Sequence, residues 1–253
     1  MGFLDSYRKR KKVFKDAVQV FRHPFYIETR RLSLEENKKE PSRTEIINFF
    51  VETVSAEHYL EIGVRNPDDN FNKINCANKY SVDPGLEFAE NPATFKVTSD
   101  QFFKELAAGA LSLPSSIKFD VIFIDGLHTA DQTEKDIQNS INYLTEEGVI
   151  LLHDCNPPTE FHQRECHGFK HSPAQNYWNG TTWKAFYKFR HQPSLYSACF
   201  DTDWGVGILS KRKFPAFNRL EQLENSYFEF DILNKNRSQH LNLLDFNLWK
   251  NKL

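Results

Sequence analysis

The chain has 253 residues, which is enough for one sizeable α/β domain with terminal additions. A charged fraction of 26% and an apolar fraction of 40% are typical of a folded globular protein and exclude a disordered chain. The formal charge of −2 gives no signal for nucleic acid or for an acidic substrate, so we expect no nucleic-acid partner.

The sequence also gives expectations about the compartment. No apolar run is long enough to cross a bilayer, and the N-terminus lacks the apolar segment of a signal peptide. The cysteines show no paired spacing, which favours reduced thiols; they are Cys76, Cys155, Cys166 and Cys199. We therefore expect a cytoplasmic protein without a transmembrane segment.

Residues 1–57 are predicted to form an N-terminal helical extension. The basic run Arg8–Lys12 precedes apolar residues at helical spacing, Pro24 interrupts this helix, and a second helix is expected to start near Pro41. Gly2 lies in a short pattern that fits N-myristoylation. A solvated basic helix face is the simplest interpretation, while weak contact with a membrane surface and a homodimer contact are left open.

From residue 58 onward, short apolar runs alternate with helical stretches. Strands are expected at 58–64, 80–83, 95–98, 119–125 and 148–154, with helices at 101–108 and 129–144. Apolar strands that alternate with helices are typical of a parallel sheet covered on both faces. The sequence therefore predicts a doubly wound, Rossmann-like α/β fold.

Beyond residue 157 the alternation stops. Residues 157–175 form a polar loop that we expect to cover a substrate site. A helix at 183–190, a strand pair at 195–200 and 206–209, and a helical tail from residue 219 are expected to follow. The predicted core domain spans 58–215, and the predicted tail, 216–253, packs on it.

Polar residues and glycine stand at the end of each predicted strand. In a parallel sheet these ends meet at one edge, which is where ligands bind. The residues concerned are Glu61, Gly63, Asp83, Ser99, Asp100, Asp125, His153 and Asp154. The sequence therefore predicts a functional site along this edge.

Gly63 and Asp83 have the spacing of a nucleotide site. A glycine permits close approach to a ribose or phosphate, and a carboxylate about 20 residues later accepts hydrogen bonds from ribose hydroxyls. The loop 64–70 contains no glycine, which argues against the pyrophosphate grip of a nicotinamide or flavin enzyme. A structural glycine and a helix-capping aspartate are an equally good interpretation of these two residues alone.

Five runs of the sequence carry a resemblance to a known family. Leu60–Val64, Val82–Pro84 and Phe119–His128 resemble consecutive motifs of class I S-adenosylmethionine-dependent methyltransferases. Glu147–Asp154 resembles the strand that follows the fourth helix of that family, and Leu195–Leu209 resembles its closing antiparallel hairpin. The Ile-Asp-Gly-x-His form is similar to small-molecule O-methyltransferases that act on sugars and antibiotics. This implies a mostly parallel seven-stranded sheet and S-adenosylmethionine as the cofactor.

The resemblance also implies roles for single residues. Glu61 and Gly63 would line the methionine part of the cofactor, Asp83 would hold the ribose hydroxyls, and Ser99 and Asp100 would lie near the adenine. Asp125 would stand beside the cofactor at the reaction centre. The first loop departs from the family pattern, because it holds one glycine where most relatives have two or three.

Asp125 and Asp154 end adjacent predicted strands, so their carboxylates could meet. Oxygen ligands of this kind suit a hard ion such as Mg²⁺. In metal-dependent relatives, carboxylates at these two positions hold Mg²⁺, with an Asp or Asn directly after the second. Here Cys155 takes that place, and a thiol is a poor Mg²⁺ ligand. Both a magnesium site and a metal-free site are therefore open.

His128 and His153 are the candidate general bases. His128 follows Asp125 by three residues, where similar enzymes place the base, and an imidazole can accept a hydroxyl proton near neutral pH. A helix-capping or packing role for His128 is the alternative. A structural zinc site is a weaker hypothesis for the Cys and His residues at 155, 162, 166, 167 and 171.

The sequence therefore predicts an enzyme that transfers a methyl group from S-adenosylmethionine to an oxygen of a small molecule, such as a sugar or a sugar-linked intermediate. Two alternatives remain. One is a non-catalytic relative that binds a ligand at the same edge, and the other is a nicotinamide-dependent oxidoreductase.

Overall fold

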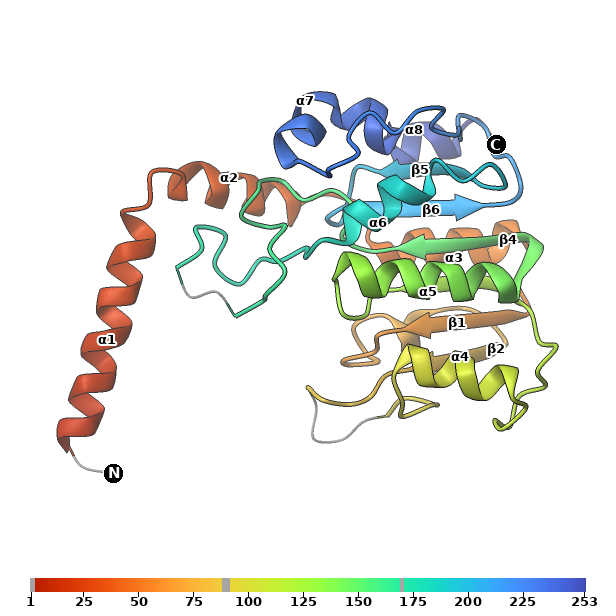
Figure 1. Cartoon of the computed structure of the whole chain (residues 1–253), viewed down its shortest axis with the longest axis horizontal. Helices are drawn as coiled ribbons and strands as arrows, with labels where there is room; N and C mark the ends of the chain where they lie inside the picture. The colour runs from red at the N-terminus through yellow and green to blue at the C-terminus, as the bar shows by residue number, and fades with distance from the viewer. Residues whose placement is uncertain (1–2, 88–91, 169–170) are drawn as a thin grey trace.

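The computed structural model describes residues 3–87, 92–168 and 171–253. In this part of the chain, seven strands form one sheet, and helices pack on both of its faces (Figure 1). The strands are β1 (His58–Ile62), β2 (Asn78–Val82), β3 (Phe119–Ile124), β4 (Leu144–Leu152), β5 (Tyr196–Phe200), β6 (Val206–Ser210) and β7 (Leu243–Leu244). The helices are α1 (Phe3–Phe21), α2 (Tyr26–Glu36), α3 (Arg43–Thr53), α4 (Ser99–Ala107), α5 (Ala130–Tyr143), α6 (Thr182–Phe189), α7 (Phe230–Leu241) and α8 (Phe246–Lys250), with one 3-10 helix, η1 (Phe71–Lys73).

The strand order is β2-β1-β3-β4-β6-β5-β7. Strands β2, β1, β3 and β4 run parallel, β6 is antiparallel to both β4 and β5, and β7 is parallel to β5. The predicted fold class is thereby confirmed, with the β5–β6 pair as the expected antiparallel hairpin. Because the parallel strands point the same way, their carboxyl ends lie at one edge of the sheet (Figure 1).

The expected strand at 95–98 was wrong. Only Phe95 pairs with the sheet, in a single bridge to Val82. Ser81 and Thr94 exchange hydrogen bonds between side-chain hydroxyls and backbone amides, at 2.9 and 3.2 Å, and these replace a continuing ladder. Thr98 then accepts a hydrogen bond from the Gln101 amide and caps α4, so the chain leaves the sheet. The seventh strand of the sheet is instead β7, which lies in the C-terminal tail that the sequence predicts to be helical.

The central strands bury side chains on both faces, because successive residues of a strand point to opposite sides. One core lies between the sheet and α4, α5, α6 and α7, and it includes Leu60, Ile122, Ile150, Phe186 and Leu233. The other lies between the sheet and α3 and α8, and it includes Tyr59, Phe123, Leu151, Phe50 and Trp249. Two-sided burial explains why these strands are almost continuously apolar.

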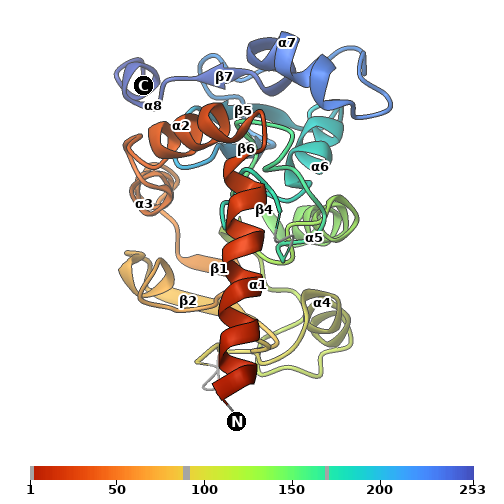
Figure 2. The same ribbon diagram turned by 90° about the vertical axis from the view of Figure 1, so that its left-hand side faces the viewer.

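The N-terminal segment has two parts that behave differently. Helix α3 begins with a capping box between Ser42 and Glu45 and buries Ile46, Ile47 and Phe50 against the sheet. Helices α1 and α2 instead project from the body of the molecule (Figures 1 and 2). The predicted division into 1–57, 58–215 and 216–253 stays a prediction. In the described residues, no helix has the length and apolarity needed to span a bilayer.

Candidate active site

The carboxyl ends of β1, β3 and β4 are held in line by hydrogen bonds that continue past the strands. The Asp125 amide donates to the Ile62 carbonyl at 2.8 Å, and the His153 amide donates to the Ile124 carbonyl at 3.1 Å. Asp125 and His153 are therefore fixed by the backbone at the edge where the sequence predicts the site.

Gly63 allows β1 and β3 to approach each other at this edge. Its φ of +91° lies in the left-handed region that favours glycine. A Cβ at this position would lie 2.3 Å from the Asp125 carbonyl oxygen and 2.6 Å from the Gly126 Cα. The glycine is therefore required by the packing of the site itself, in addition to any approach by a ligand.

Asp125, His128 and Asp154 form a tight cluster. His128 Nε2 lies 3.2 Å from Asp125 Oδ1, and His128 Nδ1 lies 2.8 Å from Asp154 Oδ2. The buried Nδ1 atom nevertheless makes no hydrogen bond of acceptable geometry. The predicted convergence of two strand-end carboxylates is seen, and the imidazole of His128 lies between them.

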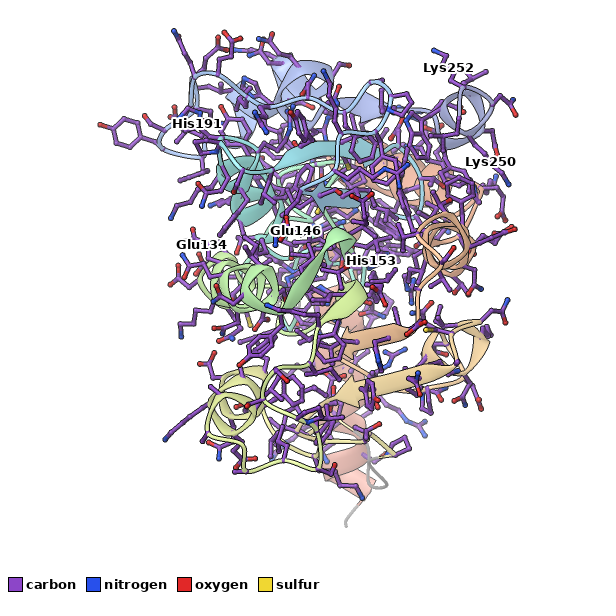
Figure 3. All side chains as sticks on the ribbon, turned by 90° about the vertical axis from the view of Figure 1, so that its right-hand side faces the viewer. Glu134, Glu146, His153, His191, Lys250 and Lys252 are labelled. Atoms are coloured by element: carbon purple, nitrogen blue, oxygen red, sulfur yellow. The ribbon has the colours of Figure 1, made fainter. Side chains whose placement is uncertain are left out.

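His153 is held from both sides. Its Nδ1 is 3.2 Å from Asp125 Oδ1, and its Nε2 is 3.0 Å from Asp203 Oδ1. The residue is 7% exposed, and Figure 3 shows it inside the body of the molecule. Because both ring nitrogens face carboxylates, His153 is well placed to orient Asp125 and poorly placed to receive a proton from a ligand.

Arg43 and Asp203 complete the cluster and were missed by the sequence analysis. Asp203 accepts a hydrogen bond from the Arg43 amide at 2.6 Å, and the Arg43 guanidinium lies 3.4 Å from Asp203 and 3.9 Å from Asp125. The buried Nε atom of Arg43 has no hydrogen-bond partner. Asp203 follows β5 in the chain and Arg43 opens α3, so no local spacing links them to β3.

The ionised groups of the cluster stabilise one another. Burial lowers the pKa of His128, but the charges of Asp154 and Asp125 outweigh burial and raise it to about 10. Burial raises the pKa of Asp203, yet the hydrogen bond and charge of His153 and the charge of Arg43 lower it to about 2. Burial likewise opposes ionisation of Asp125, and the neighbouring histidines hold its pKa well below the ordinary value.

Residues 178–180, which follow the predicted covering loop (157–175), contact the cluster. Trp178 stacks on His128 with the ring centroids 4.9 Å apart, and the Asn179 amide donates to Asp154 Oδ1 at 2.8 Å. Gly180 has φ of +62°, and a Cβ there would lie 2.0 Å from the His128 carbonyl oxygen. These three residues therefore contribute directly to the site, and the covering role of 157–175 stays a prediction.

The cluster has the donors of a metal site. One ligand atom from each of Asp125, His128 and Asp154 lies within 4.8 Å of the others, and the unbonded Nδ1 of His128 leaves a donor available. The Cys155 thiol lies apart from them, because its Sγ packs toward Gly207. A divalent cation therefore fits these residues, with Asp125 and Asp154 as oxygen donors and His128 as the third donor.

The loop cysteines and histidines are placed differently from the zinc hypothesis. His162 Nε2 lies 2.9 Å from Ser33 Oγ, and its Nδ1 lies 2.8 Å from Thr159 Oγ1. Within the described ranges, no three ligands drawn from this loop come within metal-binding distance of one another. His162 instead joins the loop to α2.

Comparison with known proteins identifies the domain that carries this site. Residues 35–155 match a family model described as a methyltransferase domain. The chain carries a methyltransferase domain. This match confirms the resemblance to class I methyltransferases and the enzyme class predicted from the sequence. No curated protein matches the chain.

Solved structures with a similar fold include three methyltransferases. The Bacillus cereus O-methyltransferase in complex with SAH is 11% identical, covers 74% of this chain and 90% of its own, and has a TM-score of 0.45. The O-methyltransferase TomG from Streptomyces achromogenes, involved in tomaymycin synthesis and bound to SAM, is 11% identical, covers 74% of this chain and 89% of its own, and has a TM-score of 0.46. The SAH-bound methyltransferase PaMTH1 from Podospora anserina is 15% identical, covers 84% of this chain and 98% of its own, and has a TM-score of 0.44. Each of these structures is similar to this chain at low sequence identity.

The cofactor residues expected of this methyltransferase lie at the same edge. Asp83 accepts hydrogen bonds from the amides of Val64 and Gly85 at 2.9 and 2.6 Å, so its carboxylate is fixed beside the first loop. Glu61 is buried and accepts hydrogen bonds from Tyr59 and Asn70 at 2.6 and 3.0 Å. Burial raises the pKa of Glu61 to about 7.

Ser99 and Asp100 open α4, farther along this side of the sheet. The Gln132 amide lies 3.2 Å from Ser99 Oγ and 3.0 Å from Asp100 Oδ1. It is also 3.1 Å from the carboxylate of Asp136, a buried residue whose pKa burial raises to about 6. Ser99 and Asp100 therefore belong to a polar group that links α4 to α5.

Proposed function

We propose that this methyltransferase transfers the methyl group of S-adenosylmethionine to a hydroxyl oxygen of a small molecule, and that the acceptor is a sugar or a sugar-linked compound. The observation that carries the proposal is the cluster of Asp125, His128 and Asp154 at the carboxyl edge of a methyltransferase domain. Acidic groups at this edge favour a sulfonium cation, and oxygen methylation requires that a proton be removed beside it.

S-adenosylmethionine supplies an electrophilic methyl group, and the protein must align an acceptor oxygen with it. In our proposal, Asp83 accepts hydrogen bonds from the ribose hydroxyls and keeps its two amide donors, because each carboxylate oxygen has two lone pairs. Glu61 and Gly63 line the methionine part, Ser99 and Asp100 lie at the adenine, and Asp125 stands between the cofactor and the acceptor.

For removal of the proton, we assign Asp125 and Asp154 as ligands of a divalent cation such as Mg²⁺, which would lower the pKa of an acceptor hydroxyl when bound. His128 has two roles open to it, as third ligand or as the base, and in either role it must first lose the proton that its raised pKa of about 10 holds near neutral pH. A mixed set of oxygen and imidazole donors also suits Mn²⁺. His153 keeps Asp125 in position through its bond to Asp203.

The first experiment measures S-adenosylhomocysteine release with a panel of sugars and nucleotide sugars. We expect turnover with at least one acceptor, and a loss on the order of a hundredfold or more in kcat/KM for Asp125→Ala while the cofactor still binds. Asp131→Ala, on the exposed start of α5, is the control and should keep full activity. Cofactor binding without turnover on any acceptor would favour the non-catalytic alternative.

Chelation then separates the two roles of His128. If it is a ligand, EDTA abolishes turnover and Mg²⁺ or Mn²⁺ restores it, while His128→Ala weakens the response to the ion. If EDTA has no effect on the wild type, the assignment of Asp125 and Asp154 as metal ligands is wrong, and His128 stands as the base.

A further inference from the structure

Helix α1 carries an apolar stripe that lies exposed outside the body of the molecule. Tyr7, Phe14 and Phe21 are spaced seven residues apart, so they line one side of the helix. They are 57%, 71% and 55% exposed, and Val13 beside them is 67% exposed. Exposed aromatic residues in a row mark a surface that contacts a partner or a membrane.

The opposite side of α1 faces the protein. Asp16 lies opposite the aromatic stripe on the helix, and its carboxylate is 3.9 Å from the His171 ring of the covering loop. Val20, on the same half of the helix as Asp16, is buried. Asp16 and Val20 therefore face the protein, and the exposed aromatic stripe points outward.

The charge of α1 distinguishes it from the rest of the chain. The helix carries six basic and two acidic residues, a net charge of +4, while the whole chain carries −2. Arg10 and Lys11 lie on either side of the stripe, three and four residues after Tyr7. Basic residues that flank an aromatic stripe are the pattern of helices that lie in the headgroup region of anionic membranes.

We propose that α1 binds the surface of an anionic lipid membrane, with the stripe of Tyr7, Phe14 and Phe21 in the headgroup region and the flanking basic residues at the lipid phosphates. A second copy of the chain is the less favourable occupant, because a symmetric helix pair would bring Arg10 and Lys11 of both copies together. Helix α1 crosses in front of the carboxyl edge of the sheet, so a membrane bound there would face the site (Figure 2).

Binding of the full chain to vesicles tests this surface without reference to the proposed reaction. We expect co-sedimentation with phosphatidylglycerol-containing vesicles and little with pure phosphatidylcholine. Phe14→Asp should abolish binding, whereas Leu248→Asp, at a residue on α8 that is 67% exposed, should leave it unchanged. Both variants should keep the wild-type Tm, because both side chains are exposed.

The contribution of the basic residues that flank the stripe is tested separately, with its own control. Replacing Arg10 and Lys11 with Gln should weaken binding about fivefold for each charge. The same change at Lys250 and Lys252, which lie at the outer rim away from α1 (Figure 3), should have no effect. Equal binding to neutral vesicles, or binding unaffected by Phe14→Asp, would overturn the proposal. So would a dimer in solution that Phe14→Asp dissociates while no vesicle binding is seen.

Discussion

Gly63 shows how one residue shapes the site. Its positive φ costs a side-chain residue about 1–2 kcal/mol, and its contact with the Asp125 carbonyl leaves no space for a Cβ. We expect Gly63→Ala to lower the free energy of unfolding by about 2–4 kcal/mol in denaturant titration. Gly109→Ala is the matched control, because Gly109 also has a positive φ but no atom within 4 Å of the place that a Cβ would occupy. The control should lose only about 1 kcal/mol. Equal losses in both variants would contradict the packing role.

Some residues of the site could be predicted from the sequence and others could not. Glu61, Asp125, His128 and Asp154 end or follow apolar strands, and parallel strands place such ends together, so the sequence predicts their convergence. Arg43 and Asp203 reach the same cluster from α3 and from the turn after β5. Their placement depends on how α3 and the hairpin pack on the sheet, which local periodicity does not encode.

At the scale of elements, the covering loop is attached to α2 through His162. The ring is buried and neutral: Ser33 Oγ donates to the Thr29 carbonyl, so it accepts from His162 Nε2, and Thr159 donates to Nδ1. Burial and the charge of Arg164 lower the pKa of His162 to about 3. Its ordinary value is near 6.5, so this attachment is fully stable above pH 6.5 and weakens as the pH falls toward 3.

We therefore expect acid to release the loop from α2 before the sheet unfolds. The ring of Trp204 lies 5.7 Å from that of His162, so tryptophan fluorescence should change between pH 6.5 and 3. His162→Asn removes the titrating ring and should abolish that transition. His191→Asn, at an exposed histidine after α6, should leave it intact. A transition of the same size in His162→Asn would show that another group causes it.

The elements themselves follow the sequence closely where apolar runs are long. Strands β3 and β4 and helix α5 lie where they were expected, although β4 begins four residues earlier than predicted, at Leu144. The secondary-structure predictions that were wrong concern short segments. The strand expected around Phe95 is reduced to a single bridge, because hydroxyl hydrogen bonds replace the ladder there. Leu243–Leu244, predicted as helical, instead form a strand that pairs with the edge of β5.

At the scale of the whole molecule, the C-terminal tail seals one face of the sheet. Trp249 is 2% exposed and packs among Phe50, Phe200 and Phe217, with ring centroids 5.0–5.8 Å apart. Trp249→Ala should lower the free energy of unfolding by about 3–5 kcal/mol, measured by urea titration. Leu248→Ala, at the exposed neighbour, should change it by less than about 0.5 kcal/mol. A small effect at Trp249 would mean that the tail is not part of the folded core.

In the proposed function, S-adenosylmethionine binds along the carboxyl edge of the sheet. Isothermal titration of the full chain with the cofactor tests this most directly, with Asp83→Ala as the site variant and Asp131→Ala as the control. We expect saturable binding by the wild type and the control, and a loss of about tenfold or more in affinity for Asp83→Ala, because a ribose acceptor is removed. No binding by the wild type at millimolar cofactor, or equal binding by Asp83→Ala, would contradict the proposed site.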